Sequence, residues 1–183
     1  EGSIVYSDED VKLLITYAGG DGNDITLSVV SDLTFTLNSD GTEYSVTDCL
    51  ASASGSLDIP STYNGLPVTL IGANAFTSCE NLSHITIPDS VTSIGRYAFS
   101  YCDSLSSITI PDSVTSIDSR AFKECTSLTN ITIPDSVTSI EYEAFAYCYD
   151  LTSVTIPDSV TSLGTYAFRG CTKLTSITFE GDA

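Results

Sequence analysis

A repeat of 23 residues fills the last two-thirds of this 183-residue chain. The unit reads L-x-x-I-x-I-P-D-S-V-T-S-I-x-x-x-A-F-x-x-C-x-x, and its period is marked by Phe76, Phe99, Phe122, Phe145 and Phe168. Periods of roughly 20 to 50 residues are typical of solenoids, in which each copy stacks on the next. One copy buries too little apolar surface to offset the entropy lost by its ordered backbone. The copies must therefore fold together as an array.

Within the unit, the pattern predicts short parallel strands joined by turns. Alternation places Ile85 and Ile87 on one face of a strand. The proline that follows cannot donate to a sheet and favours a turn with the next aspartate. The A-F-x-x-C stretch is too short for an amphipathic helix, so we expect one helical or 3₁₀ turn there and a second extended segment at residues 90–94. The predicted fold class is α/β: a right-handed solenoid of short parallel strands with brief helical or 3₁₀ turns.

The repeat begins with an irregular copy. Residues 56–60 match the I-x-I-P strand and residues 71–76 match the I-G-x-x-A-F segment, with five extra residues around 63–67 read as a longer turn. We therefore divide the chain into a β-rich amino-terminal cap, residues 1–55, and a solenoid, residues 56–183. The solenoid holds five cysteine-containing repeats and a partial carboxy-terminal strand.

Two hairpins are expected in the cap. Strands 33–37 and 42–47 form one that caps the amino end of the stack. A glycine-rich turn at residues 19–24 joins strands 13–17 and 25–29 in the other. The same glycines partly fit a calcium-binding nonapeptide, but the single copy and Thr26 at its apolar position favour the hairpin.

Six cysteines form a column, with Cys49 as a slightly displaced first member: Cys49, Cys79, Cys102, Cys125, Cys148 and Cys171. Stacked residues point the same way, so a disulfide would distort the coil. One cysteine per copy also gives no tetrahedral zinc site. We expect buried structural thiols, with disulfides and metal binding as less favoured alternatives.

Charge and composition narrow the function classes. The formal net charge is −18, from 24 acidic and 6 basic residues, which argues against nucleic acid or an anionic membrane as a partner. No apolar run is long enough to span a bilayer. The Ser/Thr-rich, Lys-poor composition favours a secreted or cell-surface location, although this chain carries no signal peptide.

No catalytic, cofactor-binding or metal-binding residues are predicted. The single histidine, His84, lies in a column of polar strand residues with no base and orienting partner. The aspartate that follows each repeat proline could suggest a calcium ladder, but turn chemistry explains it. We therefore expect a protein that is not an enzyme and needs no cofactor.

Tyrosine and basic residues gather at the variable positions of the repeat, which face solvent in a solenoid. Since tyrosine and arginine are enriched in binding hot spots, the candidate binding surface comprises Arg96, Tyr97, Tyr101, Arg120, Lys123, Tyr142, Tyr147, Tyr149, Tyr166 and Arg169. The alternative is that these side chains only pack over neighbouring coils. A second candidate face is a threonine column that β propensity also explains, at Thr86, Thr109, Thr132, Thr155 and Thr178.

The unit resembles the BspA-like leucine-rich repeats, most fully in residues 105–125 and 151–171, and the resemblance covers residues 56–183. It implies a non-catalytic bacterial surface or secreted module, adhesin-like, that binds protein or glycan through an extended face. The alternative is a structural spacer within a larger surface protein. Asp118 and Glu141 replace the family glycine kept at Gly95 and Gly164, so a different backbone is expected there.

The carboxy end starts another strand at residues 177–183 but lacks the I-P-D sequence. No capping repeat follows, and an open end exposes a sheet edge. Either the chain is a piece of a longer protein, or end-to-end contact through this uncapped end is possible.

Overall fold

The computed structural model describes residues 3–8, 11–18, 24–30 and 32–181. Near the amino end, an antiparallel sheet contains β1 (Ser3–Asp8), β2 (Val11–Ala18) and β3 (Asp24–Val30) in that order. Tyr17 pairs with Ile25, so the expected pairing of residues 13–17 with 25–29 is confirmed. The glycine-rich turn expected between these strands falls mostly on residues 19–23, which lie outside the described residues.

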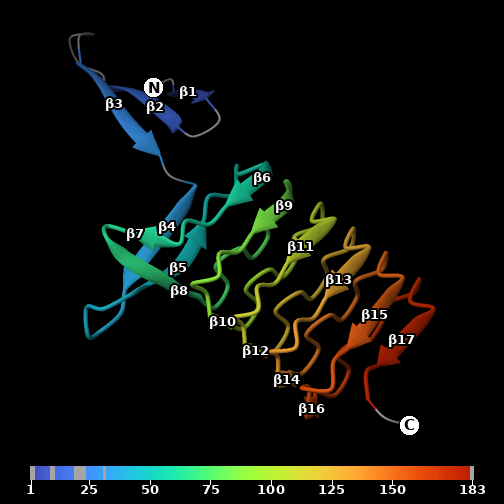
Figure 1. Ribbon diagram of the computed structural model, residues 1–183. Coiled ribbons are helices and arrows are strands. Elements are labelled where there is room, and N and C mark those ends of the chain that lie inside the picture. The colour runs from blue at the N-terminus through green and yellow to red at the C-terminus, as the bar shows by residue number, and fades with distance from the viewer. Residues whose placement is uncertain (1–2, 9–10, 19–23, 31, 182–183) are drawn as a thin grey trace.

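The repeats build two parallel sheets, and the strands of the first appear as a row of arrows in Figure 1, from β6 to β17. The first sheet contains β6 (Gly55–Asp58), β9 (Leu82–Thr86), β11 (Ser107–Thr109), β13 (Asn130–Thr132), β15 (Ser153–Ile156) and β17 (Ser176–Phe179). Adjacent strands pair one repeat apart, for example Thr109 with Thr132. The parallel-strand solenoid is therefore confirmed.

The second sheet runs through the other extended segment of each repeat. Its parallel strands are β8 (Leu66–Ile71), β10 (Ser93–Ile94), β12 (Ser116–Ile117), β14 (Ser139–Ile140) and β16 (Ser162–Leu163). The extended segment expected at 90–94 is thus only two residues long in the structure. The irregular first copy forms β7 (Thr62–Tyr63), which pairs antiparallel with β8 across the predicted longer turn.

A hairpin extends the second sheet at its amino end. Antiparallel strands β4 (Leu33–Leu37) and β5 (Tyr44–Cys49) form it, and β5 pairs in parallel with β8. The second strand starts two residues later than predicted because the Asn38 side chain accepts hydrogen bonds from the amides of Thr42 and Glu43, which lengthens the turn. The division of the chain at residue 55 remains a prediction.

The core is a set of columns parallel to the solenoid axis. Four consecutive phenylalanines, Phe76, Phe99, Phe122 and Phe145, are fully buried. Their ring centroids are 5.0, 5.1 and 5.2 Å apart, and Phe168 continues the column at 5.3 Å. Equal positions of successive repeats therefore lie directly over one another, as the unbroken period predicts. Buried leucine, isoleucine and valine side chains form parallel columns beside the rings.

The described residues contain no helix, so the expected helical or 3₁₀ turns at A-F-x-x-C are wrong and the fold is all-β rather than α/β there. Each A-F-x-x-C segment is a series of tight turns, with left-handed residues four positions apart, such as Tyr97 (φ 56°) and Tyr101 (φ 61°). A left-handed residue interrupts a right-handed helix. Type II turns require that conformation at their third residue.

The turns also join neighbouring coils. In the segment 95–102, the amides of Ala98 and Ser100 close turns three residues back, at 3.1 Å each. The alternate amides donate instead to carbonyl oxygens one repeat further on: Tyr97 to Ser119, Phe99 to Ala121 and Tyr101 to Lys123. This third ladder satisfies backbone groups that a helix would have paired internally.

Loss of the family glycine leaves the hydrogen bonds of the turn unchanged. The amides of Gly95 and Gly164 donate to the second-sheet strand of the preceding coil, at 2.9 and 2.6 Å. Asp118 and Glu141 make the equivalent bonds at 3.2 and 2.9 Å. The different backbone expected at these two positions is not reflected in their hydrogen bonding.

Five cysteine thiols donate to carbonyl oxygens of the preceding coil, and all six cysteines are free. Cys102 reaches the Phe76 oxygen at 3.1 Å, and this bond recurs at the next three cysteines. Cys49 is displaced, since its own thiol bonds the Leu50 oxygen at 3.7 Å. Burial raises the pKa of Cys102 and Cys125 well above the ordinary thiol range, so both stay protonated at neutral pH.

The cysteine column predicts six reactive thiols in denaturant without added reductant. In the native protein at pH 8, only the partly exposed Cys171 should react quickly with a thiol reagent, because the thiolate is the reactive form and burial suppresses it. Spectrophotometric titration with and without denaturant measures both numbers. Fewer than six thiols in denaturant would mean that the column contains disulfides.

Candidate binding surface

The predicted surface residues lie together on one side of the solenoid. We call the turn segments 95–102, 118–125, 141–148 and 164–171 the turn flank; each follows a second-sheet strand and precedes the next first-sheet strand. Nine of the ten candidates lie within these segments, and Tyr149 directly follows the third. The stacking that aligns the phenylalanine core therefore also gathers side chains that are up to 73 residues apart in sequence, from Arg96 to Arg169.

A first group forms around Arg120, whose guanidinium carbon lies 5.3 Å from the Tyr97 ring centroid and 5.0 Å from that of Tyr142. Its Nε donates to Glu143 at 2.8 Å, and the Tyr142 hydroxyl donates to the other oxygen of Glu143 at 2.8 Å. Arg120 also donates to the Tyr97 hydroxyl. We call these four residues the Arg120 unit. Arg96 lies over the outer end of the unit, 5.0 Å from the Tyr97 ring.

A second group forms around Arg169, which lies 5.2 Å from the Tyr166 ring centroid and 5.8 Å from that of Tyr147. We call these three residues the Arg169 unit. Tyr149 packs edge-on against Tyr147 with 6.2 Å between centroids, and Lys123 lies 5.5 Å from the Tyr147 ring. Cation–π contacts of this kind contribute about 0.5–1 kcal/mol each at exposed sites.

The two units join into one ladder, because Tyr142 and Tyr166 pack edge-on with 6.1 Å between ring centroids. The structure thus brings nine of the ten predicted residues into contact. Tyr101 is the exception: it is exposed on the turn flank, and no ring or cation contact links it to the ladder.

Sequence reasoning missed Glu143, which is 5% exposed and is the one buried charged residue among residues 32–181. Besides Arg120, it pairs with Lys123 at 3.5 Å. A signal was present, since Glu143 follows Arg120 by one repeat and equal positions stack. Opposite charges one period apart predict an ion pair between coils.

The local pKa values follow from this network. The hydrogen bond from Arg120 lowers the pKa of Glu143, and Tyr142 and the charge of Lys123 act in the same direction, against desolvation. Desolvation raises the pKa of Tyr97, but hydrogen bonds from Arg96 and Arg120 outweigh it and lower that pKa. The network therefore holds the carboxylate ionised at neutral pH.

The backbone beneath the ladder is strained. Left-handed φ values occur in the turn flank at Tyr97, Tyr101, Arg120, Glu124, Glu143, Tyr147 and Tyr166. Such a conformation costs roughly 1–2 kcal/mol for a residue with a side chain, and glycine avoids the cost. Gly170 takes one of these positions, and the Tyr147 ring covers it so closely that an added Cβ would lie 2.4 Å from a ring carbon.

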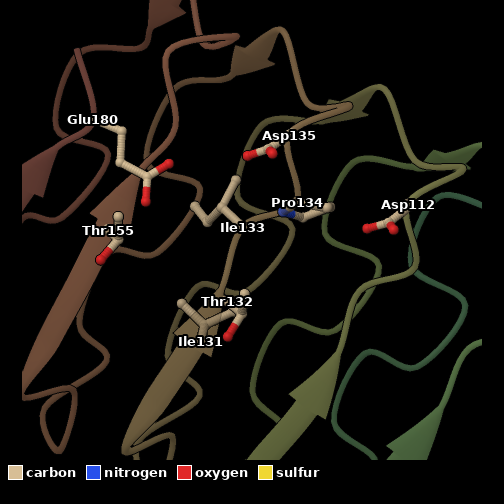
Figure 2. A pocket seen from close by; sticks show the side chains of 8 residues that line it. All are labelled: Asp112, Ile131, Thr132, Ile133, Pro134, Asp135, Thr155 and Glu180. Carbon is tan, nitrogen blue, oxygen red and sulfur yellow. The ribbon is translucent and has the colours of Figure 1, made fainter. Parts of the chain in front are cut away.

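The threonine face is separate from the turn flank. Thr86, Thr109, Thr132, Thr155 and Thr178 are exposed and pair in register along the first sheet. Beside it, a shallow hollow of about 390 Å³ opens at the ends of these strands (Figure 2) and is lined by Asp112, Ile131, Thr132, Ile133, Pro134, Asp135, Thr155 and Glu180.

The hollow contains carboxylates and hydroxyls but no histidine, cysteine or lysine that could act as a base or nucleophile beside them. Within residues 32–181, no group of acidic, histidine or cysteine side chains could hold a metal ion. His84 is half-buried and shares a 3.1 Å hydrogen bond with Ser107, its neighbour in the column.

A family model described as the BspA type leucine-rich repeat region matches residues 57–183 in 6 copies. The chain belongs to the BspA-type leucine-rich repeat family. The resemblance seen in the repeat sequence is therefore confirmed. No helix in the described part of this BspA-type chain is long and apolar enough to cross a membrane.

Solved structures of bacterial leucine-rich repeat proteins agree with this assignment. A T. pallidum leucine-rich repeat protein is 34% identical, with a TM-score of 0.77 over 80% of this chain and 68% of its own. One from Bacteroides ovatus is 32% identical, with a TM-score of 0.72 over 82% of this chain and 40% of its own. A leucine-rich cell surface protein of Faecalibacterium prausnitzii is 28% identical, with a TM-score of 0.51 over 100% of this chain and 56% of its own. The curated proteins contain no significant match.

Strain in the BspA-type turns predicts that Ser78→Gly stabilises the fold. Ser78 is exposed, has φ 60° and occupies the position that Gly170 takes four repeats later. Relief of about 1–2 kcal/mol of strain is partly offset by the larger entropy loss of glycine, about 0.5–1 kcal/mol. Urea denaturation should show a net gain of roughly 0.5–1 kcal/mol. Ser83→Gly, on strand β9 at an ordinary φ, is the matched control and should destabilise.

The buried ion pairs predict that Glu143→Gln destabilises the fold at neutral pH by about 1–3 kcal/mol, because Arg120 and Lys123 lose their shared carboxylate. The folded pKa of Glu143 lies below the unfolded value of about 4.3. Its stabilising effect is therefore complete above that pH and declines as the pH falls below it. Urea denaturation of both proteins at pH 7 and pH 3 should show the difference shrinking in acid. A difference that is equal at both pH values would contradict this role.

Proposed function

We propose that this chain is a non-catalytic interaction module, cell-surface or secreted, that binds a protein or glycan through the turn flank. One of its relatives, at 28% identity, is described as a cell surface protein. The net charge of −18 favours neither nucleic acid nor an anionic membrane as the ligand. Within residues 32–181, no group of acidic, histidine or cysteine side chains could hold a catalytic metal ion, and we propose no catalytic role.

One observation carries the proposal: tyrosine, arginine and glutamate occupy strained left-handed positions where glycine would be more stable. Strain of this kind persists where the side chain has a role that outweighs its cost. Tyr101, Tyr142, Tyr149 and Tyr166 are also exposed, at 39, 36, 40 and 54%. Rigid exposed tyrosines beside arginine are typical of binding surfaces.

The second candidate function is a structural spacer within a larger surface protein. The Arg120 unit favours it, because its contacts link neighbouring coils and satisfy each other within the chain. On this reading the ladder stabilises the stack and no ligand is needed. The two functions predict different effects on ligand binding when the exposed tyrosine rings are removed.

The test compares two triple variants. Tyr101→Ser/Tyr149→Ser/Tyr166→Ser removes exposed rings of the turn flank. Thr109→Ser/Thr132→Ser/Thr155→Ser changes the threonine face and serves as the matched control. Binding of each to immobilised fibronectin, laminin, collagen and a panel of glycans is measured by biolayer interferometry at physiological salt, and circular dichroism checks folding.

A binding module should show saturable binding to at least one panel member that weakens at least tenfold in the tyrosine variant and is retained in the threonine variant. Loss in the threonine variant alone would move the binding face to the first sheet. A spacer would show no saturable binding by the unaltered protein.

A further inference from the structure

The hollow beside the threonine face is a concave site in the middle of the stack. All of its lining residues except Glu180 belong to the coils that contain β11, β13 and β15. Each of these three strands pairs with a strand on either side. Figure 2 shows Thr132 and Thr155 at the ends of neighbouring strands beside the hollow. Its volume of about 390 Å³ falls within the range of small-molecule sites.

The hydroxyls of the threonine face are available to a ligand, unlike those of other repeated threonines. Thr129 and Thr152, in a neighbouring column, each donate to a carbonyl oxygen of the preceding coil, at 3.3 and 3.2 Å. Thr138 and Thr161, beside the second sheet, do the same at 3.2 and 3.3 Å. Within residues 32–181, the hydroxyls of the threonine face make no hydrogen bond to the protein. Each of them can therefore both donate to and accept from a bound molecule.

The polar groups of the hollow favour a ligand that is rich in hydroxyls and has no negative charge. Asp112 and Asp135 lie beside the threonines, and no basic side chain lines the hollow. Carboxylates repel an acidic ligand and are strong acceptors for hydroxyl protons. An ammonium group could only donate, so the hydroxyl protons of Thr132 and Thr155 would gain no acceptor from it. A sugar can donate to the carboxylates and accept from the threonines at the same time.

The size of the threonine face fits a glycan chain better than a protein. Five strands about 4.8 Å apart, each with about 10 Å of its length facing outward, cover roughly 250 Å². A stable protein interface takes about 800 Å² from each partner. A single glycan chain is narrow enough to lie on the smaller area. The five threonines are also uncharged in a chain whose net charge is −18, which suits an uncharged ligand.

The stacking of the coils also sets the repeat that a ligand should have. Thr132 pairs in register with Thr109 on one side and with Thr155 on the other, so the hydroxyls recur once per coil along a line. Their spacing, about 4.8 Å, is close to the length of one sugar unit in an extended β-1,4-linked chain. An α-1,4-linked chain curls instead, and its hydroxyls leave such a line after a few units.

We propose that the hollow and the threonine face bind a neutral, extended, β-linked glycan that runs along the solenoid axis with one sugar over each coil. Thr132 and Thr155 exchange hydrogen bonds with sugar hydroxyls, and Asp112 and Asp135 accept hydrogen bonds from others. This face is separate from the turn flank, so the inference goes beyond the proposed function and does not rest on it. Because the site is shallow and has no aromatic ring, a short oligosaccharide should bind with millimolar affinity.

The test titrates cellotetraose, a neutral β-1,4-linked glucose tetramer, into the ¹⁵N-labelled protein at physiological salt. Shifts of the backbone amide signals locate the binding face. Maltotetraose contains the same sugars in an α-1,4-linked chain and is the matched control probe. A chitosan tetramer, which has the β-1,4 linkage but carries ammonium groups, tests whether positive charge alone is recognised.

We expect saturable shifts with cellotetraose at the amides of β11, β13 and β15, and at least tenfold weaker binding of maltotetraose. Thr132→Val/Thr155→Val removes two hydroxyls and keeps the shape and β propensity of the side chains. It should weaken cellotetraose binding at least tenfold, because each lost hydrogen bond accounts for a factor of roughly 2 to 10.

The matched control is Thr138→Val/Thr161→Val, which makes the same change at exposed threonines outside the hollow. It should leave the binding of cellotetraose unchanged. Asp135→Asn, at an exposed turn position, weakens an acceptor without touching a strand and should reduce binding severalfold. The amide spectrum of each variant also reports whether it is folded.

Equal binding of cellotetraose and maltotetraose would overturn the proposal, since the shape of the chain would then have no effect. So would a response to the chitosan tetramer without a response to cellotetraose, which would indicate a site for ammonium groups. Equal weakening by the two valine variants would remove the special part of the hollow. Saturable shifts confined to the turn flank would support the proposed function and overturn this site, so the two can fail separately.

Discussion

Direct stacking of equal positions is the constraint on which the rest of the molecule depends. Strands in a parallel ladder lie about 4.7–4.9 Å apart, and every repeat from residue 82 to residue 173 has the same length. Each residue therefore lies against its counterparts in the coils before and after. A side chain fits the solenoid only if it packs well against the residue at the same repeat position in each neighbouring coil. That residue is either identical to it or a substitute.

Different columns of equivalent residues satisfy this packing requirement in different ways. Phenylalanine rings stack nearly parallel, with 1° between the planes of Phe122 and Phe145. Thiols and hydroxyls meet it because each can donate to a backbone oxygen of the preceding coil: Thr152 donates to the Thr129 oxygen at 3.2 Å, and Thr175 to that of Thr152 at 3.1 Å. Aspartates after the prolines are exposed, where solvent screens their mutual repulsion.

A buried charged residue cannot stack on an identical residue, because like charges repel. In the column that contains Arg120, the next coil presents Glu143, so that stacking produces an ion pair rather than repulsion. Lys123 lies close enough to share the same carboxylate, at 3.5 Å. Because removing one member of a buried pair leaves its partner uncompensated, Arg120 and Glu143 are expected to change together when the repeat varies.

Much of this architecture was predictable because it depends on periodicity alone. The period places the phenylalanines and cysteines in columns, and alternation of Ile85 with polar neighbours gives the strand its buried face. The turn flank was not predictable in the same way. Its A-F-x-x-C segment has the length and composition of one helical turn, and only glycine or asparagine signals a left-handed residue with any strength. At Tyr97 and Tyr101 neither is present, so the sequence favoured a helical turn where the chain forms successive tight turns.

The left-handed positions of the turn flank carry different residues in different coils. At Ser78, Tyr101, Glu124 and Tyr147 one backbone conformation is kept by three kinds of side chain, and at Gly170 by a residue with no side chain. The fold therefore imposes the conformation, and every copy with a residue other than glycine carries its strain. Where the residue is tyrosine, arginine or glutamate, the ladder contacts offset part of that cost. In the Arg120 unit, all of these contacts come from the chain itself.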